Sequence, residues 1–302
     1  MRYIIFGHKG QLGKEFVKIL TNKGDEWFGY DYPDFNICDY VSMFGIIEMM
    51  KPDAVINCAA YSNVEAAEIN KDIAYKVNVA GASNIASICK TNNIKFVSFS
   101  TDYVFDGLKQ YSGLYKENDK PNPLNYYGET KLKGEEIIFE NNPESLVLRT
   151  SWLYGDAPNN FINKLNQWTT DTDKIKVVND EISIPTSTEI VVNTTISAIN
   201  SNLKGLYHLT STGYCSRYEF AKAYFEIIKK DIIVYPCDSR EFYSIVKRPK
   251  FSAMDNSKIC SELDIEIPTW IDVLKRYLSG NDAEQQSTIR KRRGDVGLLF
   301  DN

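Results

Sequence analysis

The sequence predicts an α/β protein with a doubly wound parallel Rossmann sheet and a smaller C-terminal α/β lobe. Two observations support this prediction. Over the first 155 residues, short apolar runs rich in β-branched and aromatic residues alternate with segments of helical periodicity, the pattern of parallel strands joined by helices. The first run, residues 2–6, leads through a turn with three glycines into an amphipathic segment. A chain of 302 residues can form one large α/β unit or two joined domains.

The apolar runs predict the strands of the sheet at 2–6, 27–30, 54–57, 96–100 and 146–150. Helices are expected after the first turn, over 73–89, and around Tyr127 and Lys131. Beyond Gly155 the pattern is less regular, with helices expected at 159–168 and 189–199 and strands at 175–178 and 206–209.

These elements predict three parts of the chain. A Rossmann domain is expected over 1–155, with 184–204 returning to it, and a substrate lobe over 156–183 and 205–280. The tail, 281–302, contains a basic run but no apolar face, and we expect it to be disordered.

The glycine turn has the spacing Gly7-x-x-Gly10-x-x-Gly13 between a strand and a helix. Glycines allow the backbone to approach a pyrophosphate, and the free amides at the helix start favour its negative charge. Asp31 ends the second strand about twenty residues on, where a carboxylate can bind an adenosine ribose. The sequence therefore predicts a dinucleotide site.

Composition excludes several classes of function. The net charge of −5 argues against a nucleic-acid partner, and no segment has the roughly 20 apolar residues of a membrane span. Six cysteines without a C-x-x-C pair indicate reduced structural thiols, and two histidines cannot build a histidine metal cluster. The N-terminal apolar run has the length of a strand rather than of a signal peptide, so a cytoplasmic enzyme is expected.

Tyr127 and Lys131 lie four residues apart and therefore share one face of the predicted helix. A cation close to a phenol favours the phenolate, so we expect Lys131 to lower the pKa of Tyr127 and make it an effective proton donor. Spacing alone also fits a chance pair on a solvated helix. Thr101 ends the fourth strand, where its hydroxyl can hold a substrate carbonyl oxygen or simply cap the strand.

Five motifs together resemble the extended short-chain dehydrogenase/reductase family and, within it, the dTDP-4-dehydrorhamnose reductases. The motifs are the glycine turn, N-C-A-A at 57–60, S-T-D-Y-V-F at 100–105, Y-G-E-T-K at 127–131 and R-T-S-W-L-Y-G at 149–155. The similarity spans roughly residues 1–279. It implies a Rossmann domain that binds NADPH or NADH and a lobe that binds a nucleotide sugar, with Thr101, Tyr127 and Lys131 as the catalytic residues.

The resemblance also implies the binding positions. Those for the cofactor are Gly7, Gly10, Gln11, Leu12, Gly13, Asp31, Asp39, Ala59, Ala60, Tyr127 and Lys131. Those for the substrate are Ser62, Val64, Tyr103 and Trp152. For Trp152, a core role between the two parts of the chain is the alternative.

Some members of the family hold a magnesium ion between the subunits of a dimer through glutamates. Glu15 and Glu189 match two of these positions, but the third falls near Gly280, where no carboxylate exists. The sequence therefore leaves both Mg²⁺ and a homodimer open.

Three alternatives to this reductase remain. A dehydratase or epimerase of the same fold would use a similar triad, but dehydratases typically carry a glutamate where this chain has Tyr103. A non-catalytic relative, the regulatory subunit of methionine adenosyltransferase, shares much of the motif set. A reductase of another nucleotide-linked 4-keto sugar would differ only in the less regular C-terminal part.

Overall fold

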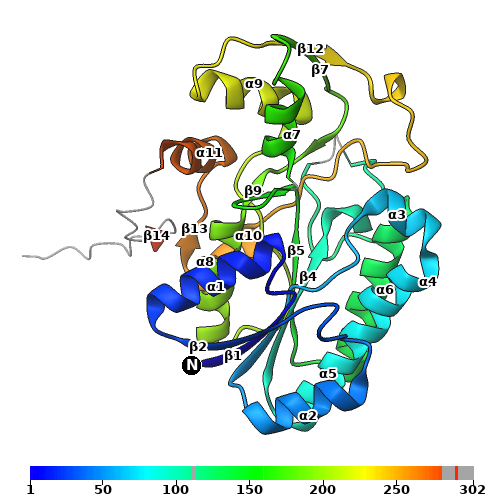
Figure 1. Ribbon diagram of the computed structural model, residues 1–302, viewed down its shortest axis with the longest axis vertical. Coiled ribbons are helices and arrows are strands. Elements are labelled where there is room, and N and C mark those ends of the chain that lie inside the picture. Colours follow the sequence, from blue (N-terminus) through cyan, green and yellow to red (C-terminus); the bar gives the residue numbers. More distant parts are fainter. Residues whose placement is uncertain (110–112, 159, 281–289, 292–302) are drawn as a thin grey trace, which may run out of the picture.

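A computed structural model describes residues 1–109, 113–158 and 160–280 of the chain and the backbone of 290–291. Its centre is a six-stranded parallel sheet with the strand order β10-β5-β4-β3-β1-β2 (Figure 1). The strands are β1 Arg2–Phe6, β2 Glu26–Tyr30, β3 Ala54–Asn57, β4 Lys95–Thr101, β5 Leu146–Thr150 and β10 Gly205–His208. This arrangement confirms the predicted doubly wound parallel sheet.

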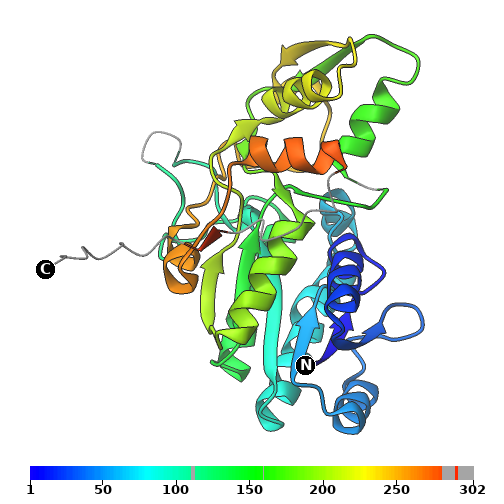
Figure 2. The same ribbon diagram turned by 90° about the vertical axis from the view of Figure 1, so that its left-hand side faces the viewer.

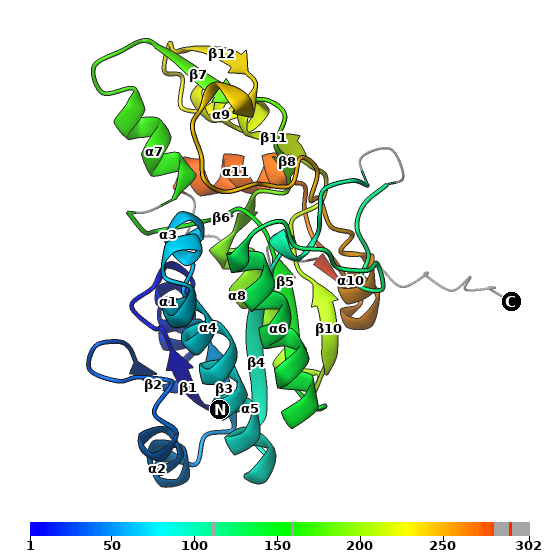
Figure 3. The same cartoon turned by 90° about the vertical axis from the view of Figure 1, so that its right-hand side faces the viewer.

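Helices cover both faces of the sheet, because alternate residues of each buried strand point to opposite sides. Tyr3 and Ile5 pack in one apolar core, and Ile4 and Phe6 pack in the other. The first core is covered by α1 (Gln11–Lys23) and α8 (Thr188–Asn200). The second is covered by α2 (Tyr40–Met50), α5 (Ala82–Thr91) and α6 (Tyr126–Asn141), of which α5 and α6 are seen in Figure 3.

The helix expected over 73–89 is interrupted by a wider, π-helical turn. Its parts are α4 (Lys71–Tyr75), the π-helix η1 (Lys76–Gly81) and α5, and the shorter α3 (Val64–Ile69) precedes them. Asn78, in the π-helical turn, accepts a hydrogen bond from the backbone N–H of Tyr61 (2.8 Å) and donates to Thr130 on α6 (3.0 Å). Such π-helical turns are frequent at functional sites, and this one ties the loop after β3 to α6.

The smaller lobe lies beyond the carboxyl ends of the strands (Figure 2). Its first part comprises β6 (Leu153–Tyr154), α7 (Phe161–Trp168), β7 (Lys174–Val178), β8 (Ile182–Ser183) and β9 (Thr186–Ser187). Its second part comprises β11 (Cys215–Ser216), α9 (Arg217–Ile227), β12 (Ile233–Cys237), the 3-10 helix η3 (Ser239–Glu241), α10 (Ser257–Leu263), β13 (Ile265–Glu266) and α11 (Trp270–Ser279). β7 pairs with β12, and β8 pairs with β11, so backbone hydrogen bonds join the two parts of the lobe. No helix among the described residues has both the length and the apolar composition needed to cross a bilayer.

Two predicted boundaries are wrong. β10, assigned to the lobe by the sequence analysis, is the sixth strand of the main sheet and pairs in parallel with β5 over Gly205–His208. It can do so because α8 returns to the Rossmann domain and packs against α1, which brings the chain back to the free edge beside β5. Within the tail expected to be disordered, Arg290–Lys291 form a short strand, β14, that pairs with β13. The rest of 281–302 lies outside the described residues.

A buried carboxyl group helps to hold the lobe on the sheet. Asp102 directly follows β4 and is 2% exposed. It accepts hydrogen bonds from the hydroxyls of Thr101 (3.2 Å), Ser183 (2.8 Å) and Ser252 (2.5 Å), and the two serines belong to the lobe. Burial raises the pKa of Asp102 above its ordinary value, although the three hydroxyls oppose this shift.

We predict that Asp102→Ala lowers the free energy of unfolding by about 1–3 kcal/mol, because buried hydroxyls lose their shared acceptor. Asp102→Asn keeps an acceptor oxygen of the same shape and should cost clearly less. Urea denaturation of both variants at one pH measures the difference. Equal stabilities of the wild type and the alanine variant would show that this cluster does not hold the lobe to the sheet.

Candidate active site

A large groove opens where the strand order of the sheet reverses, between β1 and β3. In open α/β sheets this switch point is where ligands bind. The groove has a volume of about 1060 Å³ and is lined by residues that follow β1, β2, β3, β4 and β5. They include predicted cofactor positions, namely Gly7, Gly10, Gln11, Leu12, Asp31, Ala59 and Ala60.

Two glycines of the turn are required by close backbone contacts. Gly7 has a φ of +79°, and a Cβ there would lie 2.5 Å from the backbone nitrogen of Ala59. At Gly13 a Cβ would lie 2.1 Å from the carbonyl oxygen of Gly7, so this glycine lets α1 pack on the turn. Gly10 precedes α1, and no side chain caps this helix end. The first-turn amides of α1 are therefore free to bind an anion.

Asp31 lines the groove and is held by the backbone. Its carboxylate accepts hydrogen bonds from the N–H groups of Lys9 (2.8 Å) and Tyr32 (2.9 Å). The ammonium of Lys9, a residue of the glycine turn, binds Asp34 at 3.1 Å on the exposed rim. Asp39 is placed differently from the other predicted cofactor positions. It does not line the described groove, although its neighbour Cys38 does, and its carboxylate caps α2 by accepting from Ser42.

Thr101, Tyr127 and Lys131 all line the groove, although they come from β4 and α6. The start of α6 is held in place by Asn125, which caps it through the N–H of Gly128 (2.9 Å). Gly128 itself permits a close approach, because a Cβ there would lie 2.3 Å from the carbonyl oxygen of Tyr103. The structure thus brings the three predicted catalytic residues to one site, and it explains the glycine between them.

The predicted effect of Lys131 on Tyr127 is wrong in this structure. Burial raises the pKa of Tyr127 to about 12, a hydrogen bond from Thr101 partly opposes the shift, and Lys131 does not contribute to it. Burial also lowers the pKa of Lys131 to about 8, opposed by the negative charge of Glu135. Spacing indicated that the phenol and the ammonium share a helix face, but it could not show that both groups are desolvated.

A buried ion pair lies behind Lys131 and was not recognised in the sequence. Glu135, one helical turn further along α6, binds Arg149 on β5 through two contacts of 2.9 and 2.6 Å. Arg149 and Glu135 are 2% and 5% exposed. The signal was present, since Glu135 follows Lys131 by four residues and Arg149 opens the last quoted motif. The pair fixes α6 against β5, and so it fixes the positions of Tyr127 and Lys131 relative to the sheet.

Two of the four predicted substrate positions, Ser62 and Trp152, line the groove. Tyr103 packs edge-on against the ring of Tyr127, with centroids 6.0 Å apart. Val64 is the first residue of α3. Trp152 adopts a φ of +42°, a strained conformation for a bulky residue, which turns the chain out of β5. Arg217, which the sequence analysis missed, covers the Trp152 ring.

The two glutamates considered for magnesium lie on neighbouring helices. Glu15 is on α1 and accepts a hydrogen bond from Thr188 at the start of α8, next to Glu189. Among the described residues, no group of three or more metal-binding side chains gathers in one place. Within 1–109, 113–158 and 160–280, Glu15 and Glu189 are thus not joined by a third metal-binding side chain.

Comparisons with known proteins place the chain in a family. Residues 1–282 match the family model described as the RmlD substrate binding domain. A dTDP-4-dehydrorhamnose reductase of Aggregatibacter actinomycetemcomitans is 34% identical over 91% of this chain and 97% of its own length. A dTDP-4-keto-6-deoxy-D-glucose reductase of Streptomyces niveus is 30% identical, covering 84% of this chain and 88% of that protein.

Solved structures of similar proteins support the same family assignment. A dTDP-4-dehydrorhamnose reductase from Clostridium acetobutylicum has a TM-score of 0.87 and 36% identity, and covers 92% of this chain and 99% of its own. The enzyme of the same name from Bacillus anthracis, in complex with NADP, has a TM-score of 0.88 and 33% identity, covering 92% and 98%. The chain belongs to the RmlD substrate-binding domain family, as the motifs indicated.

Proposed function

We propose that the protein reduces the C4 ketone of dTDP-4-dehydro-6-deoxy-L-mannose to give dTDP-L-rhamnose, with NADPH or NADH as the reductant. The convergence of Thr101, Tyr127 and Lys131 on one wall of a groove at the switch point carries this proposal. The names of the relatives support the substrate, and the NADP complex of the Bacillus anthracis protein supports the cofactor.

The residues of the groove fit such a cofactor. Free amides at the start of α1 suit the pyrophosphate, and the small side chains of Ala59 and Ala60 leave room beside it. Asp31 lies where a ribose hydroxyl can donate to it. When bound, the nicotinamide supplies the hydride for C4.

The chain's own residues supply the proton and stabilise the oxygen. Tyr127 donates a proton to the oxygen of the former ketone, and its raised pKa keeps the phenol protonated at neutral pH. Thr101 hydrogen-bonds the same oxygen when its hydroxyl turns its single proton from Asp102 (3.2 Å) to the substrate, while the backbone N–H of Tyr103 (3.1 Å) holds the hydroxyl oxygen in place. Lys131 places a positive charge on the same wall while it is protonated.

A second candidate substrate is another dTDP-linked 4-keto sugar. The relative from Streptomyces niveus is named for the D-glucose series, and its identity to this chain is close to that of the rhamnose-series relatives. Initial rates on a panel of nucleotide 4-keto sugars, followed as oxidation of reduced nicotinamide, separate the two. No oxidation with any member would favour a non-catalytic role. The cytoplasm remains the proposed location.

We predict that Tyr127→Phe lowers kcat by about 10²- to 10⁴-fold, because the ring still packs but the acid is lost. NADPH binding, measured by fluorescence titration, should change little. A variant that retains more than about a tenth of the wild-type rate would mean that another group is the acid.

The activity should fall as the pH rises through about 8. In this range the buried Lys131 loses its proton, whereas Tyr127, with a pKa of about 12, keeps its own. We therefore expect kcat/KM of the wild type to fall above this pH and that of Lys131→Arg, which stays charged, to remain flat. A fall at the same pH in Lys131→Arg would assign this titration to another group.

Asp31 and Lys9 should tune the choice of nicotinamide only modestly. Asp31→Ala removes a negative charge that repels the 2′-phosphate and should raise the NADPH/NADH ratio of kcat/KM, whereas Lys9→Ala should lower it. Exposed charge interactions are worth roughly 1 kcal/mol or less, so each change should stay below about tenfold. A thousandfold preference of the wild type for either cofactor would show that other groups select it.

A further inference from the structure

Arg217 is the first residue of α9, and its side chain reaches back to the end of β5. Its guanidinium carbon lies 3.5 Å from the centroid of the Trp152 ring and 4.9 Å from that of Phe161. Trp152 lines the groove and is a predicted substrate position. A guanidinium stacked on a ring keeps its five N–H donors free in its own plane. The stacking therefore holds a rigid set of donors beside the sugar side of the groove.

These donors have no acceptor in the described part of the chain. The structure shows no side-chain hydrogen bond and no ion pair for Arg217 with any described residue. Burial lowers the pKa of Arg217 below its ordinary value, although the charges of Tyr103, Glu181 and Asp102 oppose this shift. Arg217 remains partly exposed, so a ligand can reach it. In a protein that keeps such a group, an anionic ligand is the natural partner.

Other charged groups nearby already have partners. Arg248 forms an ion pair with Glu65 and donates a hydrogen bond to Ser244. Its positive charge also acts to lower the pKa of Tyr103. Asp102 is occupied by three hydroxyls. The charges of Tyr103, Glu181 and Asp102 also act on Arg217, and of these Glu181 is the competing partner whose carboxylate has no ion pair in the described part of the chain.

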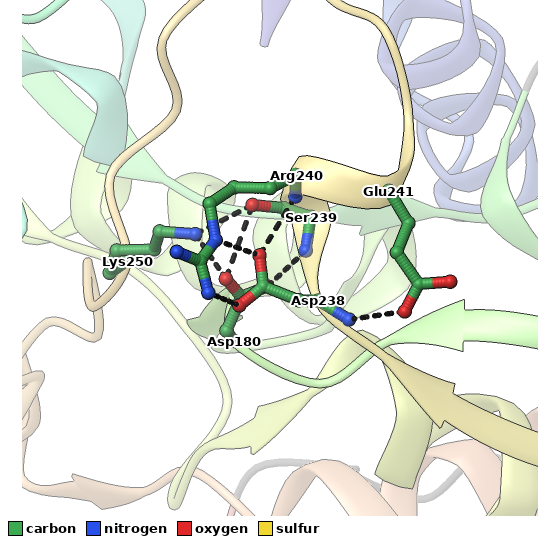
Figure 4. Close-up of polar contacts among 6 residues, drawn as sticks. All are labelled: Asp180, Asp238, Ser239, Arg240, Glu241 and Lys250. Carbon is green, nitrogen blue, oxygen red and sulfur yellow. Dashed lines mark hydrogen bonds and ion pairs between the residues drawn. The ribbon is translucent and has the colours of Figure 1, made fainter.

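A separate network of charges in the lobe, shown in Figure 4, joins the loop after β7 to η3 and to Lys250. Asp180 accepts from the N–H and hydroxyl of Ser239 and binds Lys250. Asp238 binds Arg240 through both carboxylate oxygens. These charges satisfy one another, and they fix the residues next to Glu181 and close to Arg248. Arg217 thus has no ion pair within the described residues, whereas Asp180, Asp238, Arg240 and Lys250 pair with one another.

We propose that Arg217 binds the diphosphate of the nucleotide-sugar substrate. The proposal rests on the proposed function and adds the residue that recognises the phosphates. The diphosphate is bonded to the sugar, so an anion must lie next to the wall that Trp152 forms. A planar guanidinium held by that same ring matches two phosphate oxygens at once. Trp152 therefore serves both as a wall for the sugar and as the support for Arg217.

Calorimetric titration with dTDP and with thymidine tests this proposal without turnover. The wild type should bind dTDP more tightly than thymidine. Arg217→Gln should weaken dTDP binding by about 10- to 100-fold, the size expected for a charge-assisted hydrogen bond, and leave thymidine and NADPH unchanged. The dTDP affinity of Arg217→Lys should lie between those of the wild type and Arg217→Gln, because lysine keeps the charge but not the bidentate geometry. Arg240→Gln, at an exposed arginine, is the matched control and should bind as the wild type does.

Several results would overturn the proposal. The first is that Arg217→Gln binds dTDP as tightly as the wild type does. Another is an equal loss for dTDP, thymidine and NADPH with a lowered melting temperature, which would indicate a structural role, and Arg217→Lys decides the matter if the glutamine variant does not fold. If Glu181 were the partner of Arg217, Glu181→Gln would destabilise the protein as much as Arg217→Gln does. Arg217-dependent dTDP binding in a wild type that reduces no keto sugar would instead refute the proposed function alone.

Discussion

The buried carboxyl group of Asp102 is the constraint on which the site depends. It lies one residue after Thr101, and it accepts the hydroxyls of two lobe residues, Ser183 and Ser252. The hydroxyl expected to hold the substrate oxygen and the placement of the lobe are therefore set by the same group. Ser183 lies on β8, which pairs with β11, and β11 leads directly into Arg217. A shift of the lobe would move Arg217 and disturb Thr101 together.

The second constraint is the close packing of α6. Gly128 lies against the backbone of Tyr103, and Gly134 lies against the carbonyl of Asn78, where a Cβ would be only 2.5 Å from the oxygen. Because both glycines face backbone, which cannot move aside like a flexible side chain, larger residues would push the helix out. The π-helical turn at Asn78 supplies one of these contacts and a hydrogen bond to Thr130. The two contacts set the depth at which Tyr127 lies in the groove.

Much of the Rossmann domain could be predicted, because buried parallel strands are continuous apolar runs with clear ends. The bounds of β1, β3 and β5 agree with the prediction residue for residue. Helix α2 was not predicted, since its apolar residues occur on both faces and several, such as Val41 and Met49, are exposed. The two-residue strands of the lobe are too short to show a period. β10 has a strand pattern, but its place in the main sheet depends on the path of α8, which no local pattern encodes.

The candidate site was predicted in its membership but not in its electrostatics. Thr101, Tyr127 and Lys131 meet in one groove, as the motifs indicated, yet burial moves the pKa of Tyr127 up and that of Lys131 down. Glu135 opposes the shift of Lys131, but its two oxygens are already bound by Arg149. A carboxylate neutralised in this way cannot fully compensate the desolvation of a neighbouring ammonium. The pKa of Lys131 therefore falls, but only to about 8, so Lys131 stays largely protonated at neutral pH while Tyr127 retains its proton.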